Sequence, residues 1–191
     1  MIERNPKREL TMTKENDFEY HLRRVFELAE EKGIPDPLDK SKYRELITAE
    51  KLGHNLFSGA SGGKYNDATY GADATDSEGR KVEYKSCKVS KRDYEKFLKG
   101  ELKKKYSMVY NGAYSAENIE RYRNIRHVLT LFHNEKLLMS IEVPIDHVIY
   151  SLYKVLETKE IRRAKGERVT TNCNSVTVPI LNSKPTIGEV L

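Results

Sequence analysis

The chain has 191 residues, of which 38% are hydrophobic and 33% are charged, with a formal net charge of +5 and a sequence pI of about 9.0. This length suits one domain that folds around its own core, and the sequence contains no run of about 18 apolar residues that could span a membrane. Cys87 and Cys173 are too few for a disulfide framework or a four-cysteine zinc site, and the charged N-terminus lacks the apolar core of a signal peptide. We therefore expect a cytoplasmic protein with reduced thiols and no membrane partner.

The basic charge favours a polyanionic partner. Lysine and arginine side chains that neutralise phosphates release the counterions condensed on nucleic acid, and this release drives binding. Many basic proteins bind no nucleic acid, so charge alone assigns no function.

The N-terminal part of the chain has the pattern of two helices. Apolar residues recur at helical spacing over 16–32, and Gly33 stands where a helix would end. These apolar residues are Phe18, Leu22, Val25, Phe26 and Ala29. A second helix is predicted from about 40 to 52, ended by Gly53. Residues 54–72 are rich in Gly, Ser, Asn and Tyr and predict a loop.

The middle of the chain predicts a hairpin and then a basic helix. DATDSEGRKVEYKSCKV, residues 73–89, reads as two strands around a tight turn at Ser77-Glu78-Gly79. Residues 88–106 are dominated by lysine and predict a short basic helix, whereas residues 107–115 look irregular.

The C-terminal part alternates helices and strands. A short helix is predicted over about 116–122, and the apolar runs 127–133 and 136–143 predict a hairpin. Residues 145–164 predict an amphipathic helix, and 175–181 predict a strand. The inward residues expected of that helix are Val148, Leu152, Val155, Leu156 and Ile161. The order of elements predicts a single α/β or α+β domain.

The predicted hairpin carries the residues from which chemistry can be argued. Glu83 and Lys85 are two apart on a strand, so their side chains point to the same side and Tyr84 points to the other. Asp73 begins the preceding strand, and the turn at Gly79 returns the chain toward it. Two carboxylates and one ammonium are therefore expected to converge.

Such a set of groups suits Mg²⁺-dependent phosphodiester hydrolysis. Mg²⁺ prefers oxygen ligands and usually takes one or two carboxylates, with water and phosphate completing its shell. We predict that Asp73, Glu83 and the backbone carbonyl of Tyr84 bind one or two Mg²⁺ ions. An ammonium beside carboxylates stays protonated, so Lys85 is expected to hold the attacking water and the scissile phosphate rather than act as a base.

A plainer interpretation of this segment is an exposed hairpin with alternating charges, since Glu-x-Lys is common on strands. Asp76 lies nearer the turn and is interpreted as a turn former.

An aspartate followed at this distance by Glu-x-Lys resembles the active site of the PD-(D/E)-x-K nuclease superfamily. GADATDSEGRKVEYKS, residues 71–86, is similar to the active-site hairpin of PvuII-like type II restriction endonucleases. The resemblance implies a restriction-endonuclease-like fold, with a central mixed β-sheet flanked by helices. It also implies that Asp73 and Glu83 are Mg²⁺ ligands and that Lys85 is the catalytic lysine.

The resemblance extends over most of the chain as one endonuclease domain, 1–191. It implies a helical dimerisation region at about 14–53 and a catalytic and DNA-recognition region at about 54–191. The expected assembly is a homodimer in which each subunit cuts one strand of a short palindromic site in double-stranded DNA. A cognate DNA methyltransferase is expected in the same restriction-modification system.

Several further residues are expected to contact DNA. By resemblance, Tyr122 matches a tyrosine near the scissile phosphate, and Asn172 and Asn174 lie where asparagines reach base edges. Asp39 is expected near the minor groove, and Glu50 is the candidate for a helical acid that joins the metal site. The other predicted DNA contacts are Asn111, Tyr114 and Ser115, together with Lys88 and Lys91 on phosphates.

The sequence departs from these relatives where bases are read. It has a lysine-rich insertion at roughly 90–105, Cys173 in place of one asparagine, and no histidine cluster in 110–115. The recognition sequence is therefore not predicted. Two other functions fit the same residues: a structure-selective repair or recombination nuclease with the same catalytic core, and a non-catalytic DNA-binding protein.

Overall fold

The computed structural model describes residues 18–31, 36–57, 71–113, 115–169 and 173–181. No helix in these ranges is long and apolar enough to cross a membrane. Within them the helices are α1 (Phe18–Glu31), α2 (Lys40–Leu52), α3 (Lys91–Leu98), α4 (Ala116–Glu120) and α5 (Ile145–Ala164). The strands are β1 (Asn55–Leu56), β2 (Ala74–Thr75), β3 (Lys81–Lys88), β4 (Lys103–Asn111), β5 (Arg126–His133), β6 (Lys136–Val143) and β7 (Cys173–Leu181).

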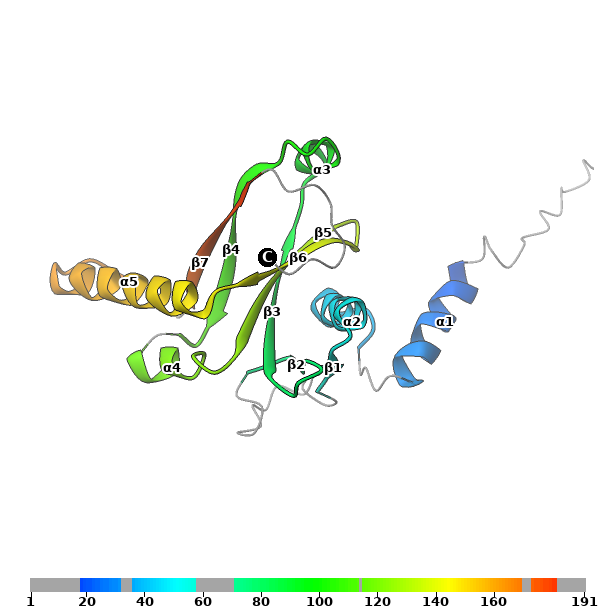
Figure 1. Cartoon of the computed structure of the whole chain (residues 1–191), viewed down its shortest axis with the longest axis horizontal. Coiled ribbons are helices and arrows are strands. Elements are labelled where there is room, and N and C mark those ends of the chain that lie inside the picture. Colours follow the sequence, from blue (N-terminus) through cyan, green and yellow to red (C-terminus); the bar gives the residue numbers. More distant parts are fainter. Residues whose placement is uncertain (1–17, 32–35, 58–70, 114, 170–172, 182–191) are drawn as a thin grey trace, which may run out of the picture.

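Two sheets organise the described chain (Figure 1). The larger has five strands in the order β1-β2-β3-β5-β6, in which β3 and β5 are parallel and the other pairs antiparallel. The second is an antiparallel pair, β4 with β7, which runs from Lys103 opposite Leu181 to Asn111 opposite Cys173; we call it the ribbon. The prediction of a mixed sheet flanked by helices in an α/β chain is confirmed.

Local chemistry explains where several elements begin and end. Asp39 caps α2 by accepting a hydrogen bond from the backbone N–H of Ser41, and Gly53 ends the helix in the left-handed conformation at φ 67°. Asn134 and Glu135 both have positive φ between β5 and β6, as a two-residue hairpin turn of this kind requires. The predicted helix end at Gly53 and the predicted hairpin are both confirmed.

Two apolar clusters hold these layers together. The larger fills the space between the five-stranded sheet, the ribbon and α5, and it includes Met108, Leu129, Leu131, Leu152 and Val176. The smaller consists of Ala49, Ala74, Val82, Tyr84 and Val128. Because these five residues come from α2, β2, β3 and β5, the smaller cluster fixes α2 against the hairpin that carries Asp73 and Glu83.

The structure corrects the predicted basic helix. Helix α3 covers only Lys91–Leu98, and Lys103–Asn111 is the strand β4, which includes residues predicted as irregular. Tyr106, Met108 and Tyr110 alternate inward along β4, and the residues between them are exposed. This period of two places one face of the strand on the core.

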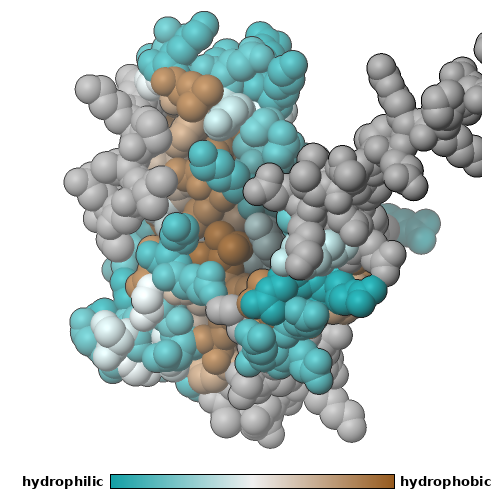
Figure 2. Space-filling view, turned by 90° about the vertical axis from the view of Figure 1, so that its right-hand side faces the viewer, coloured by the Kyte–Doolittle hydropathy of each residue, from teal (hydrophilic) through white to brown (hydrophobic). Residues whose placement is uncertain are grey.

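One prediction about a helix face is wrong. The sequence predicts an inward Ile161 on α5, but this side chain is 50% exposed. Val25 and Phe26 follow helical spacing, yet they are 41% and 46% exposed on α1, which is set apart from the sheets in Figure 1. On the side of the molecule drawn in Figure 2, hydrophobic residues form a band down the middle of the face, between hydrophilic ones.

Candidate active site

The β2–β3 hairpin holds Asp73 against the strand that carries Glu83 and Lys85. The backbone N–H of Asp73 donates to the carbonyl of Val82 at 2.8 Å, and the backbone N–H of Tyr84 donates to the Asp73 carboxylate at 2.7 Å. The register pairs Ala74 with Val82. The turn at Gly79, where φ is 74°, thus brings Asp73 back beside β3 as the sequence predicts.

Glu83 and Lys85 share one side of β3, and their side chains are in contact. The Lys85 ammonium donates a hydrogen bond to Glu83 Oε1. Glu83 is only 5% exposed. Tyr84 faces the other way into the smaller cluster, and its hydroxyl lies 2.7 Å from Nδ1 of His54. The structure therefore brings together the three residues predicted to be catalytic.

Burial and repulsion from neighbouring carboxylates disfavour the ionised forms of Asp73 and Glu83 unless a further cation lies beside them. Burial, followed by repulsion from Glu83, raises the pKa of Asp73 to about 7. Burial also raises the pKa of Glu83, although the charge of Lys85 opposes this shift. Burial acts to lower the pKa of Lys85, but pairing with Glu83 outweighs it and raises that pKa above its usual value. The ammonium therefore stays protonated, as expected from the sequence.

Helix α2 adds a second ion pair to this site. Lys42 donates to Glu45 at 2.8 Å, and both side chains are largely buried. Burial, then repulsion from Asp73, raises the pKa of Glu45, and the charge of Glu45 adds to the repulsion that raises the pKa of Glu83. The positive charge of Lys42 acts to lower the pKa of both Asp73 and Glu83. The site thus contains three carboxylates and two ammonium groups.

Glu45, rather than the predicted Glu50, is the α2 acid near the hairpin. Glu50 is exposed. Glu45 precedes the buried Ala49 by four residues and so lies on the helix face that packs on the sheet. A search for acids in register with the apolar face of α2 would have found it.

The site residues fit a divalent cation. Glu83 Oε2 is buried and has no hydrogen-bond partner, and an unpaired buried carboxylate oxygen is costly unless a proton or cation meets it. In the described ranges, no three His, Cys, Asp or Glu side chains are grouped to hold a metal. Mg²⁺ often uses only one or two carboxylates. Asp73 and Glu83, with the carbonyl of Tyr84 between Glu83 and Lys85 on β3, remain the predicted ligands.

Asp76 forms the turn as predicted and also braces the sheet. Its Oδ1 accepts hydrogen bonds from the backbone N–H groups of Glu78 and Arg80, both at 2.9 Å. Its other oxygen pairs with Arg80 and with Arg126, which also pairs with Glu142. Although burial opposes the shift, these bonds lower the pKa of Asp76. The ion-pair network links the hairpin to β5 and β6.

The predicted DNA-contacting residues lie in different environments. Asn111 is exposed at the end of β4, and Ser115 caps α4 by accepting a hydrogen bond from the backbone N–H of Asn118 at 3.2 Å. Tyr122 is half-buried, and its hydroxyl donates to the carbonyl of Asn111 at 3.1 Å. Asp39 is exposed at the start of α2.

Among the predicted base contacts that the structure describes, Asn174 has the least access to solvent. It is 2% exposed, its amide donates to the carbonyl of Ala113, and its oxygen accepts from Lys159. Its role in base reading stays a prediction. Tyr114 and Asn172 lie outside the described residues.

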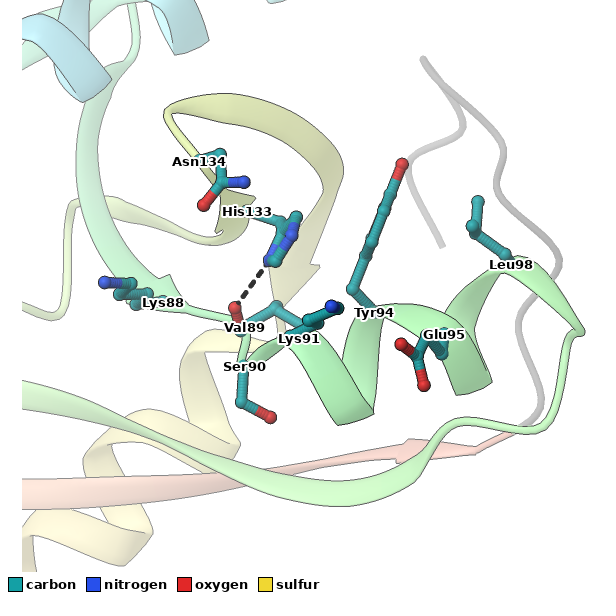
Figure 3. A pocket seen from close by; sticks show the side chains of 9 residues that line it. All are labelled: Lys88, Val89, Ser90, Lys91, Tyr94, Glu95, Leu98, His133 and Asn134. Carbon is teal, nitrogen blue, oxygen red and sulfur yellow. Dashed lines mark hydrogen bonds between the residues drawn. The ribbon is translucent and has the colours of Figure 1, made fainter.

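Lys88 and Lys91 line a pocket of about 810 Å³ at the start of α3, shown in Figure 3. Its wall includes the stacked rings of Tyr94 and His133, whose centroids are 4.2 Å apart. Nδ1–H of His133 donates to the carbonyl of Val89 at 3.0 Å, the dashed line in Figure 3. Both lysine side chains are exposed.

Comparisons with known proteins found no match for the chain, either among protein-family models or among curated proteins. The family resemblance given above is therefore still a prediction that depends on the residues themselves.

Proposed function

We propose that the chain is a Mg²⁺-dependent endonuclease of the PD-(D/E)-x-K kind that cuts double-stranded DNA at a short palindromic site, as type II restriction enzymes do. One observation carries the proposal: the half-buried Asp73 and the buried Glu83 lie on one hairpin with the protonated Lys85, and one Glu83 oxygen has no partner. This arrangement suits a divalent cation and an anionic substrate.

The chemistry follows from what each group can hold. Bound Mg²⁺ supplies a Lewis acid for the phosphate and lowers the pKa of water. Asp73 and Glu83 would hold the ion. Lys85, whose side chain is 21% exposed, can donate to the scissile phosphate and orient the attacking water. Because Lys85 keeps its proton, it stabilises negative charge and does not remove a proton.

The exposed face of the ribbon supports double-stranded DNA as the substrate. Side chains alternate along both strands, and the outward ones are polar or basic at most positions: Lys103, Lys105, Ser107, Asn111, Ser175 and Thr177. A two-stranded ribbon fits the major groove of B-form DNA, where lysine contacts phosphates and asparagine or serine contacts base edges.

The proposed homodimer has support from α1. Tyr20, Val25, Phe26 and Leu28 are each at least 38% exposed on one helix. Exposed apolar side chains are common on association surfaces, and a two-fold dimer would place two active sites symmetrically on the two strands of a palindrome.

Digestion of plasmid DNA of known sequence with and without Mg²⁺ tests the proposal. We expect discrete fragments from the unmodified protein, and at least about a hundredfold loss of cleavage in Asp73→Asn, Glu83→Gln and Lys85→Met. Glu78→Gln is the matched control, because Glu78 is an exposed acid in the same hairpin.

Other outcomes would replace this proposal. Cleavage confined to junctions or flaps would indicate a structure-selective nuclease. DNA binding without any Mg²⁺-dependent cleavage would indicate a non-catalytic DNA-binding protein.

A further inference from the structure

Three aromatic rings lie near Lys85. They belong to Tyr110 of β4, to Tyr122 just after α4, and to His127 of β5. The Tyr110 centroid is 5.1 Å from that of Tyr122 and 5.4 Å from that of His127, both close to edge-on. Tyr110 and His127 are 0% exposed, and His127 is paired in register with Glu83 on the neighbouring strand.

The donor and the acceptor can be assigned for each hydrogen bond of this cluster. Nε2 of His127 lies 3.1 Å from the carbonyl of Tyr122, and because a carbonyl only accepts, Nε2 carries the hydrogen. Burial lowers the pKa of His127 to about 4, so the ring is neutral near pH 7. Nδ1 therefore accepts, and the Tyr110 hydroxyl, 3.1 Å away, donates to it. The ring of Tyr110 is thus fixed at its hydroxyl end.

The face of that ring meets the Lys85 ammonium. Nζ of Lys85 is 5.2 Å from the Tyr110 centroid, which is within the range of a cation–π interaction. The same ammonium donates to Glu83. It is therefore held between a carboxylate on its own strand and an aromatic ring on the ribbon.

We propose that Tyr110 and His127 are positioning residues for Lys85: the ring of Tyr110 seats the ammonium, and the bond from its hydroxyl to His127 keeps the ring in place. The effect on cleavage rests on the proposed function. The effect on the ammonium does not, because it concerns only side chains that are present in the folded chain.

Tyr106 supplies a matched control on the same strand. It lies on the same face of β4, is 5% exposed, and also has a lysine over its ring, since Nζ of Lys104 is 5.5 Å from the centroid. Its buried hydroxyl has no hydrogen-bond partner. Tyr106→Phe and Tyr110→Phe therefore remove the same atom from similar environments, and only Tyr110→Phe removes a bond to an imidazole.

The first measurement is the ammonium resonance of Lys85 in ¹H–¹⁵N spectra of the full chain, assigned by its absence in Lys85→Met. We expect Tyr110→Phe to shift or broaden this resonance, because the ring that shields it is no longer fixed, and Tyr106→Phe to leave it in place. The imidazole ¹⁵N shifts of His127 in the unmodified protein should show hydrogen on Nε2 and none on Nδ1.

The second measurement is cleavage under single-turnover conditions, with DNA affinity measured in Ca²⁺. Tyr110→Phe should lower the cleavage rate between about tenfold and a hundredfold with DNA affinity within about twofold, while Tyr106→Phe should match the unmodified protein.

The results separate this inference from the proposed function. A Lys85 resonance that Tyr110→Phe leaves unchanged, or a His127 ring with hydrogen on Nδ1, would overturn the positioning role even in an active nuclease. If the unmodified protein cuts no DNA, the proposed function fails, and the resonance of Lys85 in the two phenylalanine variants still decides whether Tyr110 holds the ammonium.

Discussion

The carboxylate of Asp73 accepts a hydrogen bond from the backbone N–H of Tyr84, the residue that separates Glu83 from Lys85. A side chain at one end of the hairpin is in this way bound to the backbone of the strand that carries the other two groups. The spacing of the site therefore depends on backbone geometry more than on flexible side chains.

Asp73 should make the folded chain less stable as pH rises. Its pKa is about 7 in the folded state against an ordinary value of 3.8. Between these two pH values the folded chain therefore binds more protons than the unfolded chain. The free energy of unfolding should then fall from about pH 4 to pH 7, by on the order of 1–3 kcal/mol from this group. The measurement is urea unfolding of the unmodified chain and Asp73→Asn across this range.

The quantity to compare is the difference in the free energy of unfolding between the unmodified chain and Asp73→Asn at each pH. His127, whose lowered pKa is about 4, contributes a slope of opposite sign at overlapping pH, and it is common to both. A difference that does not change with pH would contradict the burial of an uncompensated Asp73. Mg²⁺ at saturating concentration should reduce the slope of the unmodified chain.

Asp76 should be the hairpin acid with the largest effect on stability. Its replacement by alanine removes two turn hydrogen bonds and one of the two carboxylate partners of Arg126. Because Asp76 is 4% exposed, we expect a loss of about 2–4 kcal/mol in the free energy of unfolding. Glu78→Ala, in the same turn but exposed, should change it by less than about 0.5 kcal/mol. Equal effects from the two variants would mean that the Arg126 network does not brace the hairpin.

The ion pair on α2 should tune the affinity of the site for metal. Glu45→Gln removes a negative charge near Glu83 and should weaken Mn²⁺ binding, whereas Lys42→Met removes an opposing positive charge and should strengthen it, each by about threefold to tenfold. Titration calorimetry on the chain without DNA measures both. Glu50→Gln, an exposed acid on the same helix, is the control and should leave Mn²⁺ affinity unchanged. Weaker binding in Lys42→Met would be inconsistent with this account.

Lysines on the exposed face of the ribbon should set the salt dependence of DNA binding. Replacing Lys103 and Lys105 with alanine should reduce the slope of log affinity against log salt by about 0.9 for each phosphate that is no longer neutralised. Lys136 is exposed at the start of β6, outside the ribbon, and Lys136→Ala should leave the slope unchanged. If all three lysines have equal effects on the slope, the ribbon is not the preferred DNA surface.

Features that depend on neighbours in the sequence were predictable. Gly53 ends α2 and Asn134 begins the turn after β5 because both positions need a positive φ, which glycine and asparagine tolerate. Glu83 and Lys85 share a side of β3 because the period of a strand is two. The core of the candidate site could therefore be predicted from one segment of sequence.

Features that depend on distant partners were not predictable in the same way. The lysine-rich sequence predicts a helix where β4 begins, but this segment pairs as a strand with β7, some 70 residues later in the chain. The burial of Asn174 depends on Ala113 and Lys159, which come from other parts of the fold. Glu45 rather than Glu50 reaches the hairpin because the apolar face of α2 sets the rotation of that helix.

The parallel pairing of β3 with β5 has a consequence for how such a protein can change over time. Residues 89–125 leave the sheet after β3 and return beside it, so α3, β4 and α4 form a single excursion between two fixed strands. Replacements of the exposed residues of that excursion can reshape one strand of the ribbon without displacing Glu83 or Lys85, whereas the buried Tyr110, whose ring meets Lys85, has to stay. Under the proposed function, the DNA sequence that is recognised can diverge while the residues that cut stay in place.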